Sequence, residues 1–277
     1  MKTIQWFPGH MTKAMRMMEE NVRLVDGVIL VLDARAAFAC VNKKLEKLFE
    51  NKPVVYAVNK SDLVDKADAA RICAAFAAEG KAAAAVCSTD KKTVSRLYEK
   101  ILSALKDKLE RNRAKGVYKP LRIMVAGIPN TGKSTLINAF AGAKKAVTGD
   151  KAGVTKGKQW IKLEGLELLD TPGTMPPSFD DQTYAKHLAY IGSINDDILD
   201  FEELTLELLG ELAKNRPSAL EAKYGITDFG VPPLELYEQV CRRRGFLLRG
   251  GEYDYERCAK AVVDDFRKGR MGKIALE

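Results

Sequence analysis

Several features that mark secreted or membrane proteins are missing from this chain of 277 residues. Its 5 cysteines are scattered and form no CxxC pair, so neither a disulfide framework nor a zinc ribbon is indicated. No uninterrupted apolar stretch reaches the roughly 20 residues that a bilayer requires. Trp6, Pro8 and His10 precede any apolar run, which excludes a signal peptide. We therefore expect a cytoplasmic protein with no membrane partner.

The composition is that of a globular protein with a basic surface. Apolar residues make up 46% of the chain, enough for a sizeable core. Lys and Arg number 45 against 37 Asp and Glu, a formal net charge of +8. This balance suits a polyanionic partner, and a solvated basic face is the alternative.

Apolar runs and helical segments alternate along the first part of the chain. Strands are expected at residues 28–32, 54–58, 83–87, 123–126, 160–163 and 166–169. Helices are expected at residues 42–50, 66–79, 93–113 and 134–141. The alternation predicts an α/β fold with a mostly parallel six-stranded sheet.

Beyond Pro176-Pro177 the pattern changes to amphipathic helices without strands, at residues 200–214, 234–244 and 255–267. We place a domain boundary there. Residues 1–177 form the expected nucleotide domain, and residues 178–277 form a smaller, all-helical domain.

Residues 127–134, Gly-Ile-Pro-Asn-Thr-Gly-Lys-Ser, fit the phosphate-binding P-loop pattern GxxxxGK[ST] between a strand and a helix. Backbone amides would surround the phosphates, Lys133 would hold the β- and γ-phosphates, and the Ser134 hydroxyl would ligate Mg²⁺. The expected nucleotide-binding residues of this segment are Asn130, Thr131, Gly132, Lys133, Ser134 and Thr135.

Two further elements follow the P-loop. Asp170-Thr-Pro-Gly173 ends an apolar strand, so Asp170 would reach Mg²⁺ and the Gly173 amide would sense the γ-phosphate. The same tetrapeptide is also good turn chemistry. Thr155, between the P-loop and this tetrapeptide, is the candidate threonine that closes over Mg²⁺.

The tetrapeptide Asn59-Lys60-Ser61-Asp62 has the NKxD form that reads guanine, and it ends an apolar run. Asp62 would accept two hydrogen bonds from guanine that adenine cannot donate, each worth about 1.5–3 kcal/mol. Asn59 and Lys60 would buttress the base and the P-loop. Cys87-Ser88 ends the next strand, where a backbone contact to guanine O6 is expected.

The guanine-reading tetrapeptide precedes the P-loop, the reverse of the order in Ras-like proteins. Three further segments are distinctive: the opening Trp6-Phe-Pro-Gly-His10-Met, Asp33-Ala-Arg35 and the closing Arg244-Gly-Phe-Leu-Leu-Arg-Gly-Gly251. With these segments and this order of motifs, the chain resembles the circularly permuted GTPases of the YlqF/YawG type. The resemblance covers nearly the whole chain. The chain departs from the family at Ala36-Ala37, at the Ser88 loop and at Thr174.

The resemblance implies GTP and GDP as ligands and hydrolysis of GTP with Mg²⁺. It also implies binding to the immature large ribosomal subunit, release after hydrolysis, and a monomer off the ribosome. Thr174 is too short to orient water as glutamine does, and the resemblance nominates His10 as the catalytic group. It also suggests a K⁺ ion at Asn130. His187 is interpreted as structural.

Two basic clusters in the helical domain contain no acidic residue: Arg242-Arg243-Arg244 with Arg249, and Arg267-Lys268 with Arg270 and Lys273. Such density suits phosphate contact, and the resemblance implies ribosomal RNA. The expected RNA-binding residues are Arg242, Arg243, Arg244, Arg249, Lys268 and Arg270. Nearby acidic residues keep a solvated helical face as the alternative.

Two other functions compete with the GTPase interpretation. A P-loop kinase for a nucleotide or metabolite would need an acceptor pocket and would make the NKxD match accidental. An RNA-binding module with a purely structural nucleotide site would show no turnover.

Overall fold

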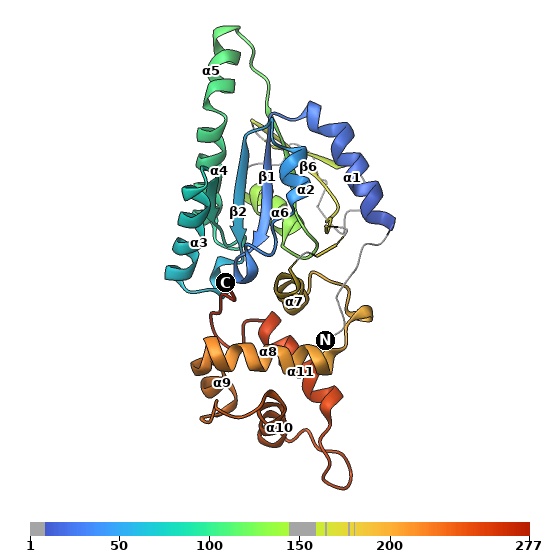
Figure 1. Ribbon diagram of the computed structural model, residues 1–277. Coiled ribbons are helices and arrows are strands. Elements are labelled where there is room, and N and C mark those ends of the chain that lie inside the picture. The colour runs from blue at the N-terminus through green and yellow to red at the C-terminus, as the bar shows by residue number, and fades with distance from the viewer. Residues whose placement is uncertain (1–8, 144–158, 164, 177, 180) are drawn as a thin grey trace. The chain divides into compact units, whose positions relative to one another are not determined.

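A computed structural model describes residues 9–143, 159–163, 165–176, 178–179 and 181–277 of the chain. Its internal contacts group into two compact units. The first, called here the sheet unit, runs from Gln5 to Asp180 and includes Glu277. The second, the helical unit, includes Asp181–Leu276 (Figure 1).

The sheet unit is built on six strands in the order β3-β2-β1-β4-β6-β5. Five are parallel: β1 (Gly27–Asp33), β2 (Val54–Asn59), β3 (Ala82–Ala85), β4 (Leu121–Ala126) and β6 (Leu166–Asp170). The edge strand β5 (Gln159–Leu163) pairs antiparallel with β6. All seven residues of β1 are buried, as expected of a central parallel strand with both faces covered. The predicted sheet is confirmed.

Helices cover both faces of this sheet. They are α1 (Gly9–Asn21), α2 (Lys43–Leu48), α3 (Lys66–Ala78), α4 (Lys91–Ala104), α5 (Lys106–Ala114) and α6 (Lys133–Ala143), with short 3₁₀ turns at η1 (Val22–Leu24), η2 (Ala34–Ala36) and η3 (Ser61–Leu63). Side chains alternate along a strand. Val55 therefore faces the core shared with Leu97 of α4 and Phe140 of α6. Tyr56 faces the other side, where its hydroxyl donates to Glu46 of α2 at 2.6 Å (Figure 1).

The helix expected at residues 93–113 is in fact two helices, α4 and α5. The break falls at Leu105, which is buried in the core beside Gly27, whereas no residue of α5 is buried. Keeping Leu105 in the core while the polar residues after it remain in water requires the chain to turn. The sequence analysis also did not predict α1.

The helical unit contains α7 (Gln182–Tyr190), η4 (Asp196–Ile198), α8 (Phe201–Asn215), α9 (Pro217–Tyr224), α10 (Pro233–Arg244) and α11 (Tyr255–Arg267). Its core forms around α8, whose Leu204, Leu208 and Leu212 are buried. Aspartates cap the helix starts: the Asp200 carboxylate accepts from the Glu203 amide at 3.0 Å, which satisfies an otherwise orphan donor. The three helices predicted here are confirmed. None of the helices in the described part of the chain is both long enough and apolar enough to span a membrane.

Candidate nucleotide-binding site

The loops that carry the nucleotide motifs meet at one edge of the sheet. β1, β2, β4 and β6 are parallel, so the residues that follow them lie at the same, carboxyl edge. Asp33 and Asn59 are paired in register at the ends of β1 and β2. Ligands of open α/β sheets bind outside this edge.

Side chains of the guanine-reading loop hold the backbone of the P-loop. The Asn59 amide donates to the Thr131 carbonyl at 2.8 Å, and the Lys60 ammonium donates to the Asn130 carbonyl at 2.7 Å. The Ser88 hydroxyl donates to the Asn59 side-chain oxygen at 2.9 Å, which joins the Ser88 loop to the same network. Residues about 70 positions apart in the chain thus form one site.

The backbone at these contacts is unusual. Among the described residues, Lys60 (φ 56°) and Asn130 (φ 60°) are the non-glycine residues with positive φ. This left-handed conformation is uncommon outside glycine, and the surrounding structure must hold it. The hydrogen bond from Lys60 to Asn130 joins these two residues to each other.

Asp33 anchors this network through an ion pair with Lys60, a role that the sequence analysis did not assign. Its fully buried carboxylate accepts from the Arg35 guanidinium at 2.9 and 2.7 Å and lies 2.8 Å from the Lys60 ammonium. Burial alone would raise the pKa of Asp33, but Arg35 and Lys60 outweigh it and hold the pKa below its usual value. The detectable signal was a carboxylate at the end of a buried strand, followed two residues later by arginine.

Within the P-loop, Lys133 and Thr131 both donate to the Ile128 carbonyl, at 2.7 and 3.1 Å. Burial lowers the pKa of Lys133 to about 8. Gly132 has φ 90°, and a Cβ there would collide with the Asn59 amide. Only glycine therefore allows the guanine-reading loop to approach the P-loop this closely.

The residues expected to hold Mg²⁺ lie together. The Ser134 hydroxyl oxygen is 3.4 Å from an Asp170 carboxylate oxygen, and these hard oxygen donors suit Mg²⁺. Gly173 lies against the P-loop, because a Cβ there would be 2.6 Å from the Pro129 nitrogen. The Thr174 amide continues this contact by donating to the Gly127 carbonyl at 3.2 Å.

Other expected residues lie at or near the same edge. Asp62 is exposed in η3, and its carboxylate makes no ion pair with the described residues. The Cys87 amide donates to the Thr93 hydroxyl at 3.0 Å, and Thr135 is exposed in the first turn of α6. Thr155 lies outside the described residues.

The two histidines of the chain lie in different elements. His10 is the second residue of α1, and its side chain lies outside what the structure describes. Its neighbour Met11 accepts a hydrogen bond from the Met175 amide at 3.3 Å, so the start of α1 lies beside the segment after Gly173. His187 is buried in α7 and contacts Glu211 at 2.7 Å, which fits a structural role.

Thr174 is fully buried in the sheet unit. Its hydroxyl has no hydrogen-bond partner among the described residues. The side chain is thus withdrawn from solvent as well as short.

The two basic clusters of the helical unit differ in whether acidic side chains pair with their cations. Arg242, Arg243, Arg244 and Arg249 are exposed and form no ion pairs with the described residues. In contrast, Lys268 and Arg270 bind Asp264 at 2.8 and 3.0 Å. The second cluster contains no acidic residue in sequence, but Asp264, four residues before Lys268, pairs with it across one helical turn, which favours the alternative of a solvated helical face there.

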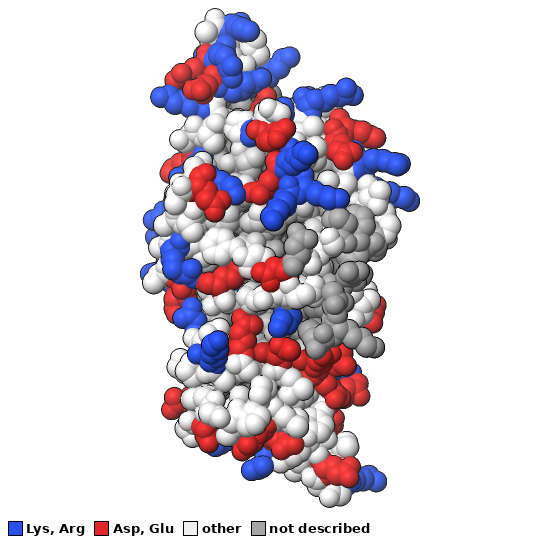
Figure 2. All heavy atoms as spheres, in the orientation of Figure 1, with Lys and Arg blue, Asp and Glu red and all other residues white. Residues whose placement is uncertain are grey.

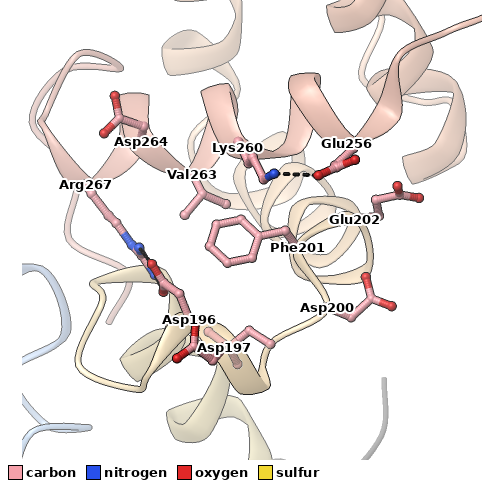
Figure 3. Close-up of a pocket in the computed structure, with 11 residues that line it drawn as sticks. Asp196, Asp197, Asp200, Phe201, Glu202, Glu256, Lys260, Val263, Asp264 and Arg267 are labelled. Atoms are coloured by element: carbon pink, nitrogen blue, oxygen red, sulfur yellow. Dashed lines mark hydrogen bonds and ion pairs between the residues drawn. The ribbon is translucent and has the colours of Figure 1, made fainter.

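Acidic side chains also dominate the groove beside that second cluster, which has a volume of about 790 Å³ (Figure 3). Its lining includes Asp196, Asp197, Asp200, Glu202, Glu256 and Asp264. Lys260 and Arg267 also line it but are paired with Glu256 and Asp196. Phosphate would be repelled here, so the α10 cluster is the better candidate for RNA contact.

Comparisons with known proteins agree with this geometry. A family model described as 50S ribosome-binding GTPase matches residues 122–211. Ribosome biogenesis GTPase A of Priestia megaterium is 38% identical over 278 residues, covering 99% of this chain and 96% of that protein. The chain belongs to the ribosome biogenesis GTPase A family.

Two solved structures of a ribosome biogenesis GTPase A relative, YlqF of Thermotoga maritima, share the fold. The GDP-bound structure has a TM-score of 0.64 at 25% identity and covers 94% of this chain and 97% of that one. The GNP-bound structure has a TM-score of 0.63 at 26% identity, with 96% and 97% covered.

Substituting Asp62 tests the guanine-reading assignment. Asp62→Asn should weaken GTP binding and shift preference toward xanthine nucleotides, because the xanthine 2-oxo group needs a donor where guanine needs an acceptor. Titration of the purified variant with GTP and XTP measures the change, and Asp65→Asn, three residues on, is the control. GTP binding equal to that of the parent would contradict the assignment.

Substituting Asp33 tests the anchor. Asp33→Asn leaves Lys60 and Arg35 without their buried countercharge, a change that typically costs about 3–5 kcal/mol. We expect lower thermal stability and, in protein that is still folded, at least tenfold weaker GTP binding because Lys60 no longer holds Asn130. Glu110→Gln, which breaks an exposed pair with Lys106, should change neither. A folded Asp33→Asn protein with parental GTP affinity would exclude this role.

Proposed function

We propose that this protein is a cytoplasmic GTPase that binds the immature large ribosomal subunit, promotes its late assembly and leaves after GTP hydrolysis. The observation that carries the proposal is the pair of hydrogen bonds from Asn59 and Lys60 to the P-loop backbone. A chance NKxD match would not make these contacts, which weakens the kinase alternative. Membership of a ribosome biogenesis GTPase family supports the partner.

Each motif has a proposed task in nucleotide binding. Asp62 reads guanine, and Asn59, Lys60, Ser61, Cys87 and Ser88 shape its pocket. The amides and side chains of Asn130, Thr131, Gly132, Lys133, Ser134 and Thr135 hold the phosphates. Gly173 senses the γ-phosphate.

Ser134 and Asp170, with Thr155, would hold Mg²⁺, and Asn130 would hold K⁺ if that ion is used. A bound cation neutralises charge that develops on the phosphates. The 3.4 Å approach of Ser134 to Asp170 supports the proposed magnesium pair.

His10 is the proposed group that orients or polarises the attacking water. Thr174 is too short and is buried, and its hydroxyl cannot reach the solvent from there. The contact of Met11 with Met175 supports His10 by bringing the start of α1 beside the segment after Gly173.

Release after hydrolysis needs a path from the phosphate to the subunit-binding surface. The segment after Gly173 leads directly into α7 of the helical unit rather than back into the sheet. When the γ-phosphate leaves, the contacts of this segment with Pro129 and Gly127 can change. Because the segment continues into α7, such a change can be transmitted along the chain to the helical unit and alter its binding to the subunit.

Sedimentation with large ribosomal subunits tests this function. The purified protein should pellet with subunits in the presence of a non-hydrolysable GTP analogue and be released with GDP. In the same assay, replacing Arg242, Arg243 and Arg244 by alanine should weaken pelleting and reduce its salt dependence. No association in any nucleotide state would refute the proposal, and an unchanged triple variant would show that the α10 cluster is a solvated face.

Substituting His10 separates catalysis from binding. His10→Ala should slow subunit-stimulated hydrolysis at least tenfold with nearly unchanged GTP affinity, because the proposed role is in the transition state. Lys133→Ala, the comparison variant, should damage both. Parental single-turnover rates in His10→Ala would remove His10 from the mechanism.

A further inference from the structure

A second basic surface lies on the sheet unit, around α5 and the loop that follows it. We call it the α5 patch and define it by six exposed side chains: Arg23, Arg111, Arg113, Lys115, Lys119 and Lys162. None of the six forms an ion pair with another described residue. Figure 2 shows Lys and Arg, with acidic side chains among them, at the top of the view.

The acidic residues beside the patch are mostly occupied by other cations. Asp26 pairs with Lys108 at 3.3 Å, and Glu167 pairs with Arg122 at 2.8 Å. Glu110 of α5 pairs with Lys106 at 3.8 Å. Asp107 lines the same hollow as Arg111 and offsets one of the six cations, so the patch keeps a net positive charge. This contrasts with the second cluster of the helical unit, where acidic partners neutralise the cations.

The patch is concave and partly apolar. Three adjoining hollows of about 470, 320 and 200 Å³ share Leu24, whose side chain is 44% exposed. Lys119, Arg111 and Lys162 each line one of them. Beside Lys119, the ring of Tyr118 is 88% exposed. Cations set around hollows with an exposed aromatic ring suit phosphates and unpaired bases.

The patch cannot be part of the nucleotide site. It lies where β1, β4 and β6 begin, since Leu121 of β4 is paired with Leu166 of β6 and Asp26 immediately precedes β1. The nucleotide motifs follow the other ends of the same parallel strands. The sheet therefore separates the two sites by the length of its strands.

We infer that the α5 patch is an RNA-contact surface that binds the sugar-phosphate backbone and exposed bases of large-subunit RNA. The inference rests on the proposed function, which supplies the RNA. An acidic protein surface is the competing partner. Interfaces between proteins are depleted in lysine, whereas three of the six cations of this patch are lysines. Lysine and arginine side chains commonly contact the phosphates of nucleic acids.

The test replaces Arg111, Lys115 and Lys119 by alanine in the full chain. Cosedimentation with large subunits across a salt series should show at least tenfold weaker association. The slope of log affinity against log salt should fall by about 2 to 3, if each side chain neutralises one phosphate. GTP affinity of the isolated variant should stay parental, because the residues lie at the other edge of the sheet.

The matched control replaces Lys91, Lys92 and Arg96, three exposed cations of α4 that also form no ion pairs among the described residues. It removes the same charge and should retain parental association. Equal losses in both variants would overturn the inference, because net charge alone would then explain them. If the parent associates with the subunit and the α5 variant shows the same affinity and the same salt slope, the inference is overturned, and the proposed function is left intact. A parent that never associates would refute both.

Ultraviolet crosslinking of the parent on the subunit identifies the class of partner. Nucleotide adducts on the peptide that contains Tyr118 are expected, and Tyr118→Phe should preserve association where Tyr118→Ala reduces it severalfold. Contacts of this peptide with ribosomal proteins alone would overturn RNA as the partner.

Discussion

The Lys60 ammonium, held between the Asp33 carboxylate and the Asn130 carbonyl, is the interaction on which the candidate site depends. The guanine-reading loop and the P-loop lie about 70 residues apart in the chain, so chain continuity does not align them. A buried carboxylate must therefore position the lysine, and the lysine must position the P-loop. Hydrogen bonds to charged groups contribute about 1.5–3 kcal/mol each, enough to hold two left-handed residues in place.

Much of the fold was readable from the sequence, because parallel strands buried on both faces give continuous apolar runs. Ras-like motifs placed the loops, and the structure brings Asn59, Ser88, Thr131 and Ser134 into one region. The break at Leu105 was not readable, since periodicity continues through it while burial of one side chain decides the turn. Nor was the role of Asp33, because its partner Lys60 follows another strand, and only the register of Asp33 with Asn59 brings the two side chains together.

Net charge was the least informative feature of the sequence. A formal charge of +8 does not show where cations are available, because short-range pairing decides this. Lys268 and Arg270 form a basic cluster in sequence but pair with Asp264, whereas the six cations of the α5 patch were not recognised and form no ion pair among the described residues. Spatial pairing, rather than cluster density, distinguishes a surface that can attract RNA from a solvated helical face.

The proposed division of tasks follows from the same geometry. The proposed phosphate-binding groups sit on loops that follow strands of the sheet, with Gly173 packed against Pro129 and the Thr174 amide hydrogen-bonded to the Gly127 carbonyl. The proposed water-orienting group, His10, belongs instead to α1, which contacts this segment through Met11. Binding and hydrolysis then depend on different elements. A partner that repositions α1 can accelerate hydrolysis without altering nucleotide affinity, because the hydrogen bonds from Asn59 and Lys60 that hold the P-loop come from other elements.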